Sequence, residues 1–369
     1  MNIRARNHRL SITLLASLLS NIALLTLFSL PASAQSELTR TTSPTFPFPI
    51  FFSSAETPPL QELPRLTIDP NRITVSGVSS GAFMAVQLHV AHSNIIKGAA
   101  SVAGGIWECA KGNLKRSQNV CMGNPKSIQT EEYLDLAKER ERRGDIDPLK
   151  NLETARIAIF ASPGDTVTRA EAADKLEDFY RHFIKRGTIT RLTNPTAAHG
   201  FPTLAFGNEC SKAGVPWMLN CSDDVAGKIL RAIDPRIPSA RTQQNASSIL
   251  YFDQHELLGT SANMYSWAAA YIPQTCMNSR RGCGLHIALH GCQMNPDFIQ
   301  SQFIENSGFN EWAEANHLVI LYPQAAKSLS NPYGCWDWFG LTGSKYTSKS
   351  GPQIVALREL MTSIGVEER

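Results

Sequence analysis

The chain has 369 residues, of which 43% are hydrophobic and 18% are charged, and its formal net charge is +3. This length and composition are typical of a globular protein with a sizeable core. Residues 1–34 carry three arginines and no acidic residue, so the remainder of the chain is formally neutral. A neutral chain has no electrostatic basis for binding nucleic acid or an anionic membrane surface, and we expect neither as a partner.

The N-terminal segment has the pattern of a secretory signal peptide. Its three arginines precede a mostly apolar stretch at 10–30, and Ala32-Ser33-Ala34 follows as a cleavage pattern. We therefore predict a signal peptide over residues 1–34 and a secreted mature protein, either extracellular or periplasmic. An uncleaved membrane anchor is the alternative, because the stretch approaches the ~20 residues needed to span a bilayer. No later stretch of the sequence is apolar enough to span a membrane.

All eight cysteines follow the predicted signal peptide. An even number in an exported chain indicates disulfides rather than free thiols, and the lack of a C-x-x-C pair argues against zinc. Closeness in sequence suggests three pairs, and the last two cysteines then pair by elimination, although sequence alone does not choose among the possible pairings. The suggested pairs are Cys109–Cys121, Cys210–Cys221, Cys276–Cys283 and Cys292–Cys335.

Residues 35–65 form a leader rich in serine, threonine and proline, a composition that favours an extended linker. From 66 to 369, short β-branched runs alternate with helix-period segments without a clear break. This alternation predicts a single α/β catalytic domain with a mostly parallel central sheet. The expected strands are 72–76, 95–102, 155–161, 188–193, 248–253, 284–290 and 318–322. The expected helices are 82–92, 130–142, 169–185, 222–233, 303–316 and 353–364.

The sequence Gly77-Val78-Ser79-Ser80-Gly81 joins the first expected strand to the first expected helix. A G-x-S-x-G turn in this context is the nucleophile elbow of α/β-hydrolases, in which the central serine is strained and exposed. We therefore predict Ser79 as a nucleophile and the backbone N–H of Ser80 as an oxyanion donor. The flanking glycines are expected because a Cβ would collide where strand and helix pass. An ordinary glycine–serine turn is the alternative.

A serine nucleophile needs a base, and the base needs an acid that orients it. In α/β-hydrolases the acid and the histidine follow the serine in that order. Asp165 follows the buried run at 155–161, at a strand's carboxyl end, where such sheets collect their active sites. His199 follows the next strand in a Gly/Pro loop. We predict Asp165 as the acid, with a helix cap or turn as the alternative, and His199 as the base.

A second loop, Leu289-His290-Gly291-Cys292, ends another expected strand and is similar to the oxyanion loops of esterases. We assign the second oxyanion donor to the backbone N–H of Cys292. His286 and His290 have helical metal-ligand spacing, but four residues of strand span about 13 Å, which argues against a shared metal site. The loop ordinarily precedes the serine elbow. Here it follows the elbow, which predicts a circularly permuted α/β-hydrolase.

Four motifs in one order resemble the polyhydroxybutyrate depolymerases, most closely their circularly permuted, single-domain members. The resemblance covers most of residues 66–369. Its motifs are Gly77-Val78-Ser79-Ser80-Gly81-Ala82-Phe83-Met84-Ala85, Ala198-His199-Gly200-Phe201-Pro202-Thr203, Leu289-His290-Gly291-Cys292 and Asn331-Pro332-Tyr333-Gly334-Cys335-Trp336-Asp337-Trp338.

The resemblance implies a role for each candidate residue. Ser79 would be the nucleophile, Asp165 the orienting acid and His199 the general base. The N–H groups of Ser80 and Cys292 would form the oxyanion hole, with Cys292 held by a disulfide to Cys335. Trp336 and Trp338, beside that bridge, would line an apolar crevice for the polyester chain. No metal or organic cofactor is implied.

The function implied is that of a secreted serine esterase acting on poly(3-hydroxybutyrate) or hydroxyalkanoate oligomers through an acyl-enzyme. Many secreted members carry a separate polymer-adsorbing domain, whereas few residues follow Trp338. Adsorption would then use the catalytic domain's own apolar surface, unless the substrates are soluble oligomers. Two other functions stay open: a feruloyl or acetylxylan esterase on the same scaffold, and a non-catalytic surface-binding protein.

Overall fold

The computed structural model describes residues 57–238, 240–258 and 262–367. The predicted signal peptide and the leader as far as residue 56 lie outside the described residues. The end of the leader does lie within them. Gln61 N donates to Tyr251 O at 2.8 Å, and Leu60 forms a β-bridge with Tyr251. This contact attaches the segment before the first strand to an edge strand of the sheet.

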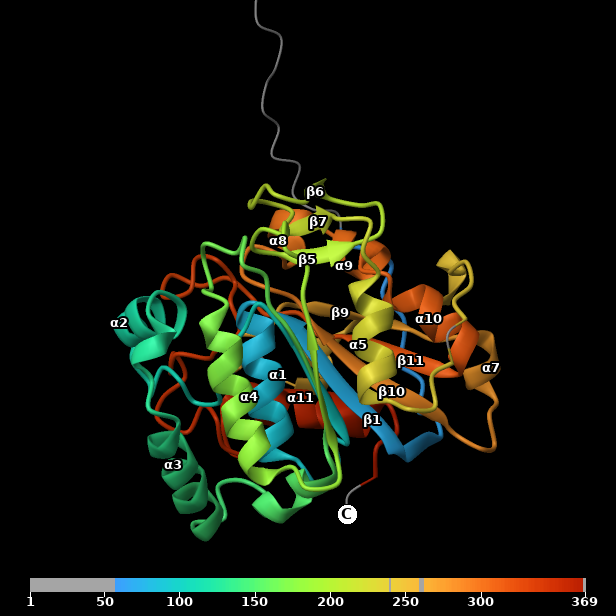
Figure 1. Ribbon diagram of the computed structural model, residues 1–369. Coiled ribbons are helices and arrows are strands. Elements are labelled where there is room, and N and C mark those ends of the chain that lie inside the picture. Colours follow the sequence, from blue (N-terminus) through green and yellow to red (C-terminus); the bar gives the residue numbers. More distant parts are fainter. Residues whose placement is uncertain (1–56, 239, 259–261, 368–369) are drawn as a thin grey trace, which may run out of the picture. The chain divides into compact units, whose positions relative to one another are not determined.

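An eight-stranded sheet forms the centre of the fold, in the order β4-β3-β2-β1-β10-β11-β9-β8 (Figure 1). Neighbouring strands pair in parallel except at β9, which is antiparallel to both β11 and β8. The predicted α/β class with a mostly parallel sheet is confirmed. The strands are β1 Ile68–Val78, β2 Gly98–Val102, β3 Arg156–Phe160, β4 Thr188–Leu192, β8 Ile249–Asp253, β9 Trp267–Tyr271, β10 Cys283–Leu289 and β11 Leu318–Tyr322.

The two central strands bring the serine elbow and the His-Gly-Cys loop together. β1 pairs with β10, with Thr74 opposite His286 and Gly77 opposite Leu289. Parallel strands that are neighbours end at the same edge of a sheet. The segments that follow β1 and β10 therefore meet there, although β10 comes late in the chain. This is the permuted arrangement that the order of the motifs predicts.

Helices cover both faces of the sheet, as its parallel strands require. The helices α1 (Ser80–Ala91), α4 (Glu171–Phe183) and α11 (Pro352–Ser363) contribute to one core. The other core contains α5 (Val225–Ile233), α9 (Gln302–Asn306) and α10 (Phe309–Asn316). The remaining helices are α2 Leu114–Arg116, α3 Thr130–Arg142, α6 Gln254–Leu258, α7 Gln274–Met277 and α8 Pro296–Ile299, with 3-10 or π turns at Ser117–Met122, Pro125–Ser127, Leu149–Thr154 and Ala246–Ser248.

Strand β3 shows how one strand supplies both cores. Ile157 and Ile159 belong to the core under α1, α4 and α11, whereas Ala158 and Phe160 belong to the core under α5 and α10. Successive side chains of a strand point to opposite faces, so a strand that is buried on both sides is apolar throughout. The uninterrupted run Ile-Ala-Ile-Phe, rather than an alternating pattern, is therefore what this position requires.

A small second sheet was not predicted. It has the order β5-β7-β6 and is drawn at the top of Figure 1. Strands of two or three residues are too short to show an alternating pattern in the sequence. Its strands are β5 Phe201–Thr203, β6 Asn208–Glu209 and β7 Met218–Asn220.

Besides the short helices, two differences from the prediction have a clear local cause. The expected helix at 303–316 is divided into α9 and α10, because Gly308 has a left-handed φ of 90° between them. The strand β9 was missed, because Trp267-Ala268-Ala269-Ala270-Tyr271 contains no β-branched residue. Every residue of β9 is buried, so packing overrides the weak strand propensity of alanine.

The four suggested disulfides all form. They join Cys109 to Cys121, Cys210 to Cys221, Cys276 to Cys283 and Cys292 to Cys335. Over the described ranges, no helix is long and apolar enough to cross a membrane. The same residues contain no group of three or more His, Cys, Asp or Glu side chains that could hold a metal ion.

Candidate active site

The G-x-S-x-G turn has the strained geometry predicted for it. Ser79 precedes α1 with φ 55° and ψ −120°, a backbone conformation that residues other than glycine rarely adopt. A Cβ on Gly77 would lie 2.1 Å from Gly81 O, and a Cβ on Gly81 would lie 2.3 Å from His290 O. Gly77 is therefore required by the turn itself, and Gly81 by the close approach of β10.

Ser79, His199 and Asp165 form a continuous line of hydrogen bonds. His199 Nε2 lies 2.9 Å from Ser79 Oγ, and His199 Nδ1 lies 2.8 Å from Asp165 Oδ2. Because a carboxylate can only accept, Nδ1 carries the ring proton and Nε2 accepts from the Ser79 hydroxyl. Asp165 and His199 are only 4% and 5% exposed. The structure thus brings together three residues that lie far apart in the sequence.

The two carboxylate oxygens of Asp165 have different hydrogen-bond partners, one set in its own turn and the other on His199. It follows β3, and its Oδ1 accepts from the backbone N–H groups of Val167 (2.8 Å) and Thr168 (2.9 Å). Its Oδ2 faces His199. Asp165 therefore lies in a turn and also faces the imidazole. The turn bonds through Oδ1 fix the carboxylate, and the fixed carboxylate orients the imidazole.

The His199 loop is held against the small sheet. Ala198 N donates to Cys210 O at 2.8 Å, and Phe201 N donates to Trp217 O at 2.8 Å. The Trp217 ring meets the His199 ring edge-on, with 5.8 Å between ring centroids. Backbone bonds on both sides of His199, together with this ring contact, restrain the imidazole.

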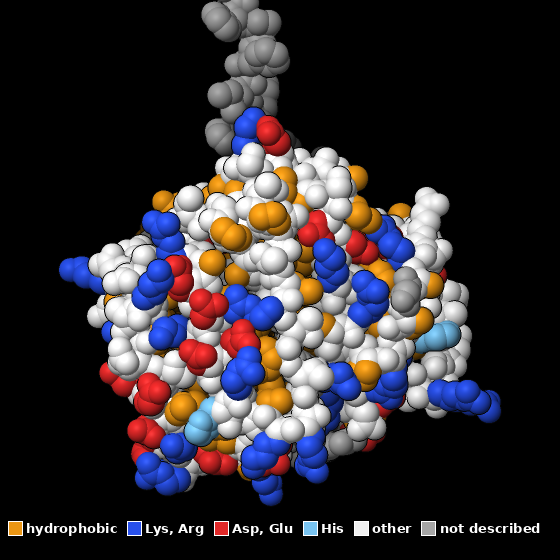
Figure 2. Space-filling model, viewed as in Figure 1, with side chains coloured by type: hydrophobic (Ala, Val, Ile, Leu, Met, Phe, Trp, Pro, Cys, Tyr) orange, Lys and Arg blue, Asp and Glu red, His pale blue; other side chains and the backbone are white. Residues whose placement is uncertain are grey.

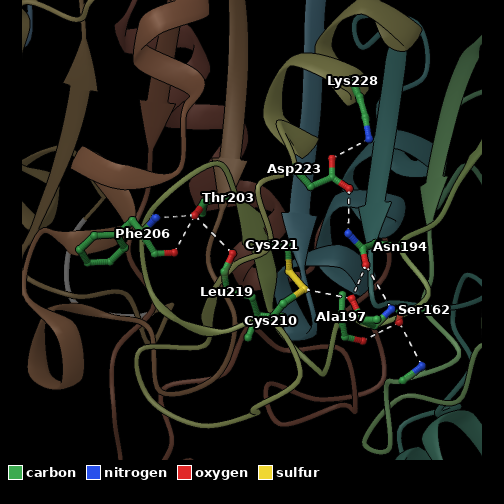
Figure 3. The surroundings of a disulfide bond; sticks show 12 residues. Ser162, Asn194, Ala197, Thr203, Phe206, Cys210, Leu219, Cys221, Asp223 and Lys228 are labelled. Atoms are coloured by element: carbon green, nitrogen blue, oxygen red, sulfur yellow. Dashed lines mark hydrogen bonds and ion pairs between the residues drawn. A yellow bond between two sulfur atoms is a disulfide. The ribbon is translucent and has the colours of Figure 1, made fainter.

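A serine that the sequence analysis did not single out connects the acid loop to the histidine loop. In Figure 3, Ser162 Oγ donates to Ala197 O, and it also accepts from Gly164 N at 3.0 Å. Ser162 therefore links the turn that carries Asp165 to the residues just before His199. The sequence feature that could have identified Ser162 is its position at the start of the Ser-Pro-Gly-Asp turn.

The same loop is attached to the start of α5. Asn194 Oδ1 accepts from Thr196 N at 3.1 Å, and Asn194 Nδ2 donates to Asp223 Oδ2 at 3.1 Å. Asp223 Oδ1 accepts from Lys228 Nζ at 2.6 Å (Figure 3). Asp223 is thus a second buried carboxylate near the histidine loop, and it has no contact with the His199 ring among the hydrogen bonds of the described residues.

The two predicted oxyanion donors, the backbone N–H groups of Ser80 and Cys292, lie in the segments that follow the neighbouring strands β1 and β10. Ser80 is the first residue of α1, a position whose N–H has no acceptor within the helix. A Cβ on Gly291 would lie 3.3 Å from Ser79 Cβ, so the loop after β10 passes directly beside Ser79. Cys292 comes next and is bonded to Cys335. Both N–H groups therefore belong to backbone that adjoins Ser79.

Ser79 and His199 open into a cavity of about 450 Å³. Cys292 lines this cavity as well. Most of the other lining side chains are apolar or aromatic, which is typical of a small-molecule site with a few fixed polar groups. These include Leu114, Met122, Val167, Trp217, Met294, Pro332, Tyr333, Trp338 and Phe339.

The two predicted crevice tryptophans differ in position. Trp338 lines the cavity and stacks on Phe83, with 4.0 Å between ring centroids. Trp336 does not line it: its side chain is fully buried, and its ring lies 5.4 Å from the His290 ring. The prediction that Trp336 lines the crevice is therefore wrong. Trp336 instead packs beneath the cavity, against His290.

The histidine pair on β10 is not arranged as metal ligands. His286 is fully buried, with Nδ1 2.9 Å from Thr74 Oγ1 and Nε2 2.8 Å from Ser76 Oγ. Burial lowers the pKa of His286 to about 3, so this ring stays neutral at pH 7. His290 has separate partners, described below. The ring of His286 is therefore hydrogen-bonded to side chains of β1, whereas the ring of His290 is bonded to other parts of the fold.

No protein-family model matches the chain. Two curated relatives align with most of it. A poly(3-hydroxybutyrate) depolymerase of Delftia acidovorans is 36% identical over 308 residues, which are 82% of this chain and 61% of the relative. A polyhydroxybutyrate depolymerase of Talaromyces funiculosus is 35% identical over 312 residues, 80% of this chain and 90% of the relative. The chain thus spans less than two thirds of the Delftia protein.

Two solved structures are also similar. A PHB depolymerase with a serine-to-alanine substitution, complexed with an R3HB trimer, matches with a TM-score of 0.76 at 32% identity. PHB depolymerase from Penicillium funiculosum matches with a TM-score of 0.75 at 33% identity. Each alignment covers 82% of this chain and 99% of the solved one.

Proposed function

This chain belongs to the polyhydroxybutyrate depolymerase family, and we propose that it is a serine esterase that hydrolyses the ester bonds of poly(3-hydroxybutyrate) or of its oligomers. The observation that carries the proposal is the line of hydrogen bonds from Ser79 through His199 to Asp165. This line opens into a largely apolar cavity, which suits a polyester better than a charged or strongly polar substrate.

Acylation begins when Ser79 Oγ attacks the ester carbonyl carbon and His199 Nε2 accepts the hydroxyl proton. The carbonyl π electrons move to oxygen, and the resulting oxyanion accepts hydrogen bonds from the N–H groups of Ser80 and Cys292. Removal of one such donor typically costs ~3 kcal/mol of transition-state stabilisation. Asp165 Oδ2 stabilises the imidazolium through Nδ1–H.

The tetrahedral intermediate then expels the alcohol end of the polyester. The C–O bond breaks, the departing alkoxide takes the proton from His199 Nε2, and the acyl group stays on Ser79 Oγ. Water enters, gives a proton to His199 and attacks the acyl carbon through a second oxyanion. Breakdown of that intermediate returns the proton to Ser79 and releases a hydroxy acid.

The polymer would be held by an apolar rim around the cavity. We define this rim as Leu114, Val167, Leu329 and Tyr333, which are large hydrophobic side chains between 38% and 106% exposed. Three of them line the cavity, and Leu329 precedes the lining residue Ser330. Figure 2 shows further hydrophobic side chains at the top of that view, where the small sheet lies, with charged side chains denser below. A rim of this kind favours contact with a solid polyester surface.

Secretion forms part of the proposal. Four disulfides support an oxidising compartment, because such bonds persist outside the cytosol. The signal-like sequence at 1–34 supports the same location.

The substrate is tested by offering the purified protein a suspension of poly(3-hydroxybutyrate) and, in parallel, feruloylated and acetylated xylan. We expect the suspension to clear and hydroxybutyrate to be released. Release of ferulate or acetate without clearing would contradict the polyester assignment and favour a carbohydrate esterase. No hydrolysis of any ester would favour a surface-binding protein.

A further inference from the structure

His290 is a buried histidine beside the nucleophile that takes no part in the proton transfers described above. It follows β10 and is fully buried. Its Nδ1 lies 2.7 Å from Gly291 O, and its Nε2 lies 3.1 Å from Ala325 N. Both ring nitrogens are therefore bonded to backbone groups, one of which belongs to the oxyanion loop.

The two backbone partners fix the proton on this ring. Ala325 N–H can only donate, so Nε2 is an acceptor, and Gly291 O can only accept, so Nδ1 carries the hydrogen. Burial lowers the pKa of His290 to about 4, so the imidazole is neutral at pH 7. A neutral ring with the proton on Nδ1 satisfies both bonds at once.

The bond to Gly291 O acts on the peptide group that carries the proposed oxyanion donor. Gly291 C=O and Cys292 N–H belong to the same peptide unit. In the described residues the single cis peptide is Val215–Pro216, so this unit is trans and its C=O and N–H point in opposite directions. When His290 holds the carbonyl on its own side, the N–H is directed to the other side.

We propose that His290 is a positioning residue, which holds the Gly291–Cys292 peptide so that the Cys292 N–H is presented to the oxyanion. The inference rests on the proposed function, since it assumes that this N–H serves an ester's developing charge. Gly291 has no Cβ to restrict its backbone, so an external hydrogen bond is the natural means of fixing the peptide. A side chain there would press on Ser79 Cβ at 3.3 Å.

The neighbours of His290 are arranged to hold its ring. Ala325, which donates to Nε2, has its own carbonyl bonded to Asn295 Nδ2 at 2.9 Å. The Trp336 ring packs 5.4 Å from the imidazole, and Trp336 N donates to Ser80 Oγ at 3.3 Å. This packing gives Trp336 a role beneath the site in place of the predicted contact with substrate.

Two isosteric substitutions separate the two ring nitrogens. In His290→Asn, the side-chain amide can occupy the place of Nδ1 and still donate to Gly291 O. In His290→Gln, the amide reaches the place of Nε2 and can accept from Ala325 N–H, but the bond to Gly291 O is lost. Both variants remove the aromatic ring, so each controls for loss of packing in the other.

The assay compares turnover of a soluble ester, p-nitrophenyl butyrate, with binding of an alkyl trifluoromethyl ketone. Ser79 Oγ adds to the ketone carbon, His199 takes the hydroxyl proton, and the product carries an oxyanion in place of the ketone oxygen. We expect His290→Gln to lower kcat by about 10- to 100-fold with KM within twofold, since loss of one oxyanion donor costs about 100- to 1,000-fold. Affinity for the ketone should fall by the same factor as kcat/KM. His290→Asn should keep kcat within about threefold.

Equal losses in the two variants, or a loss in His290→Gln that follows thermal stability and spares ketone affinity, would overturn the proposal. If His290→Gln does not fold, His290→Asn decides, and a tenfold or greater loss of its kcat contradicts the proposal. The wild-type protein distinguishes a failure of the proposed function from a failure of the role proposed for His290. If it fails to turn over the ester or to bind the ketone, the proposed function fails rather than the role of His290.

Discussion

Replacement of Asp165 by asparagine changes one atom of the acid and should invert the hydrogen bonding of the histidine. Oδ1 accepts from Val167 N–H and Thr168 N–H. The asparagine oxygen must stay there, because an NH₂ group in that place would lose two hydrogen bonds, each worth about 1 kcal/mol. The asparagine NH₂ then faces His199 Nδ1, where Asp165 Oδ2 now accepts at 2.8 Å.

That NH₂ donates, so His199 Nδ1 becomes an acceptor and the ring proton moves to Nε2. Nε2 then donates to Ser79 Oγ across the present 2.9 Å contact and no longer removes its proton. A substitution of this kind in a serine protease lowers kcat about 10,000-fold, equivalent to about 5.4 kcal/mol. We expect Asp165→Asn to have an effect of this order.

The assay is kcat on p-nitrophenyl butyrate together with thermal unfolding. Asp223→Asn is the matched control, because Asp223 is also buried and bonded near the same loop but does not contact His199. It should keep kcat within about threefold, whatever its effect on Tm. The reasoning is refuted if Asp165→Asn keeps more than about a tenth of wild-type kcat, or if the two variants lose activity equally.

Three further predictions concern the disulfide, the elbow and the rim. Removing the Cys292–Cys335 bridge by double serine substitution should lower the free energy of unfolding by about 4 kcal/mol, because the bridge joins residues separated by 43 positions in the sequence. The same change at Cys276–Cys283, where the sequence separation is 7, should lower it by about 2 kcal/mol. Equal urea midpoints for the two variants would contradict this. Gly81→Ala should prevent correct folding, because its Cβ would lie 2.3 Å from His290 O, and a soluble, active variant would contradict the assigned contact. Leu329→Ser should weaken adsorption to a polyhydroxybutyrate film without changing kcat on the soluble ester, and unchanged adsorption would show that Leu329 takes no part in the rim.

The sequence was most informative where chemistry imposes a local pattern. The elbow glycines, the acid after a buried strand and the histidine in a Gly/Pro loop could all be located, because a strained turn and strand-end loops leave recognisable residues. The displaced His-Gly-Cys loop also indicated a permuted chain, and the pairing of β1 with β10 brings that loop to the elbow. The tertiary positions of Ser79, Asp165 and His199 agree with these local signals.

What escaped prediction depends on contacts between distant segments. The inward orientation of Trp336 is fixed by packing on His290, and no local pattern distinguishes it from Trp338. The link from Ser162 to Ala197 joins two loops after neighbouring strands and needs the sheet to exist first. β9 is alanine-rich and becomes a strand only because it completes the sheet between two others.

The identity of the nucleophile can be measured directly by trapping the acyl-enzyme. The protein is mixed with p-nitrophenyl 3-hydroxybutyrate, quenched in acid within a turnover and digested for mass spectrometry. A 3-hydroxybutyryl group on the peptide containing Ser79, absent after Ser79→Ala, is the predicted result. An unmodified Ser79 peptide during confirmed turnover, or an acyl group on another residue, would contradict the proposed mechanism.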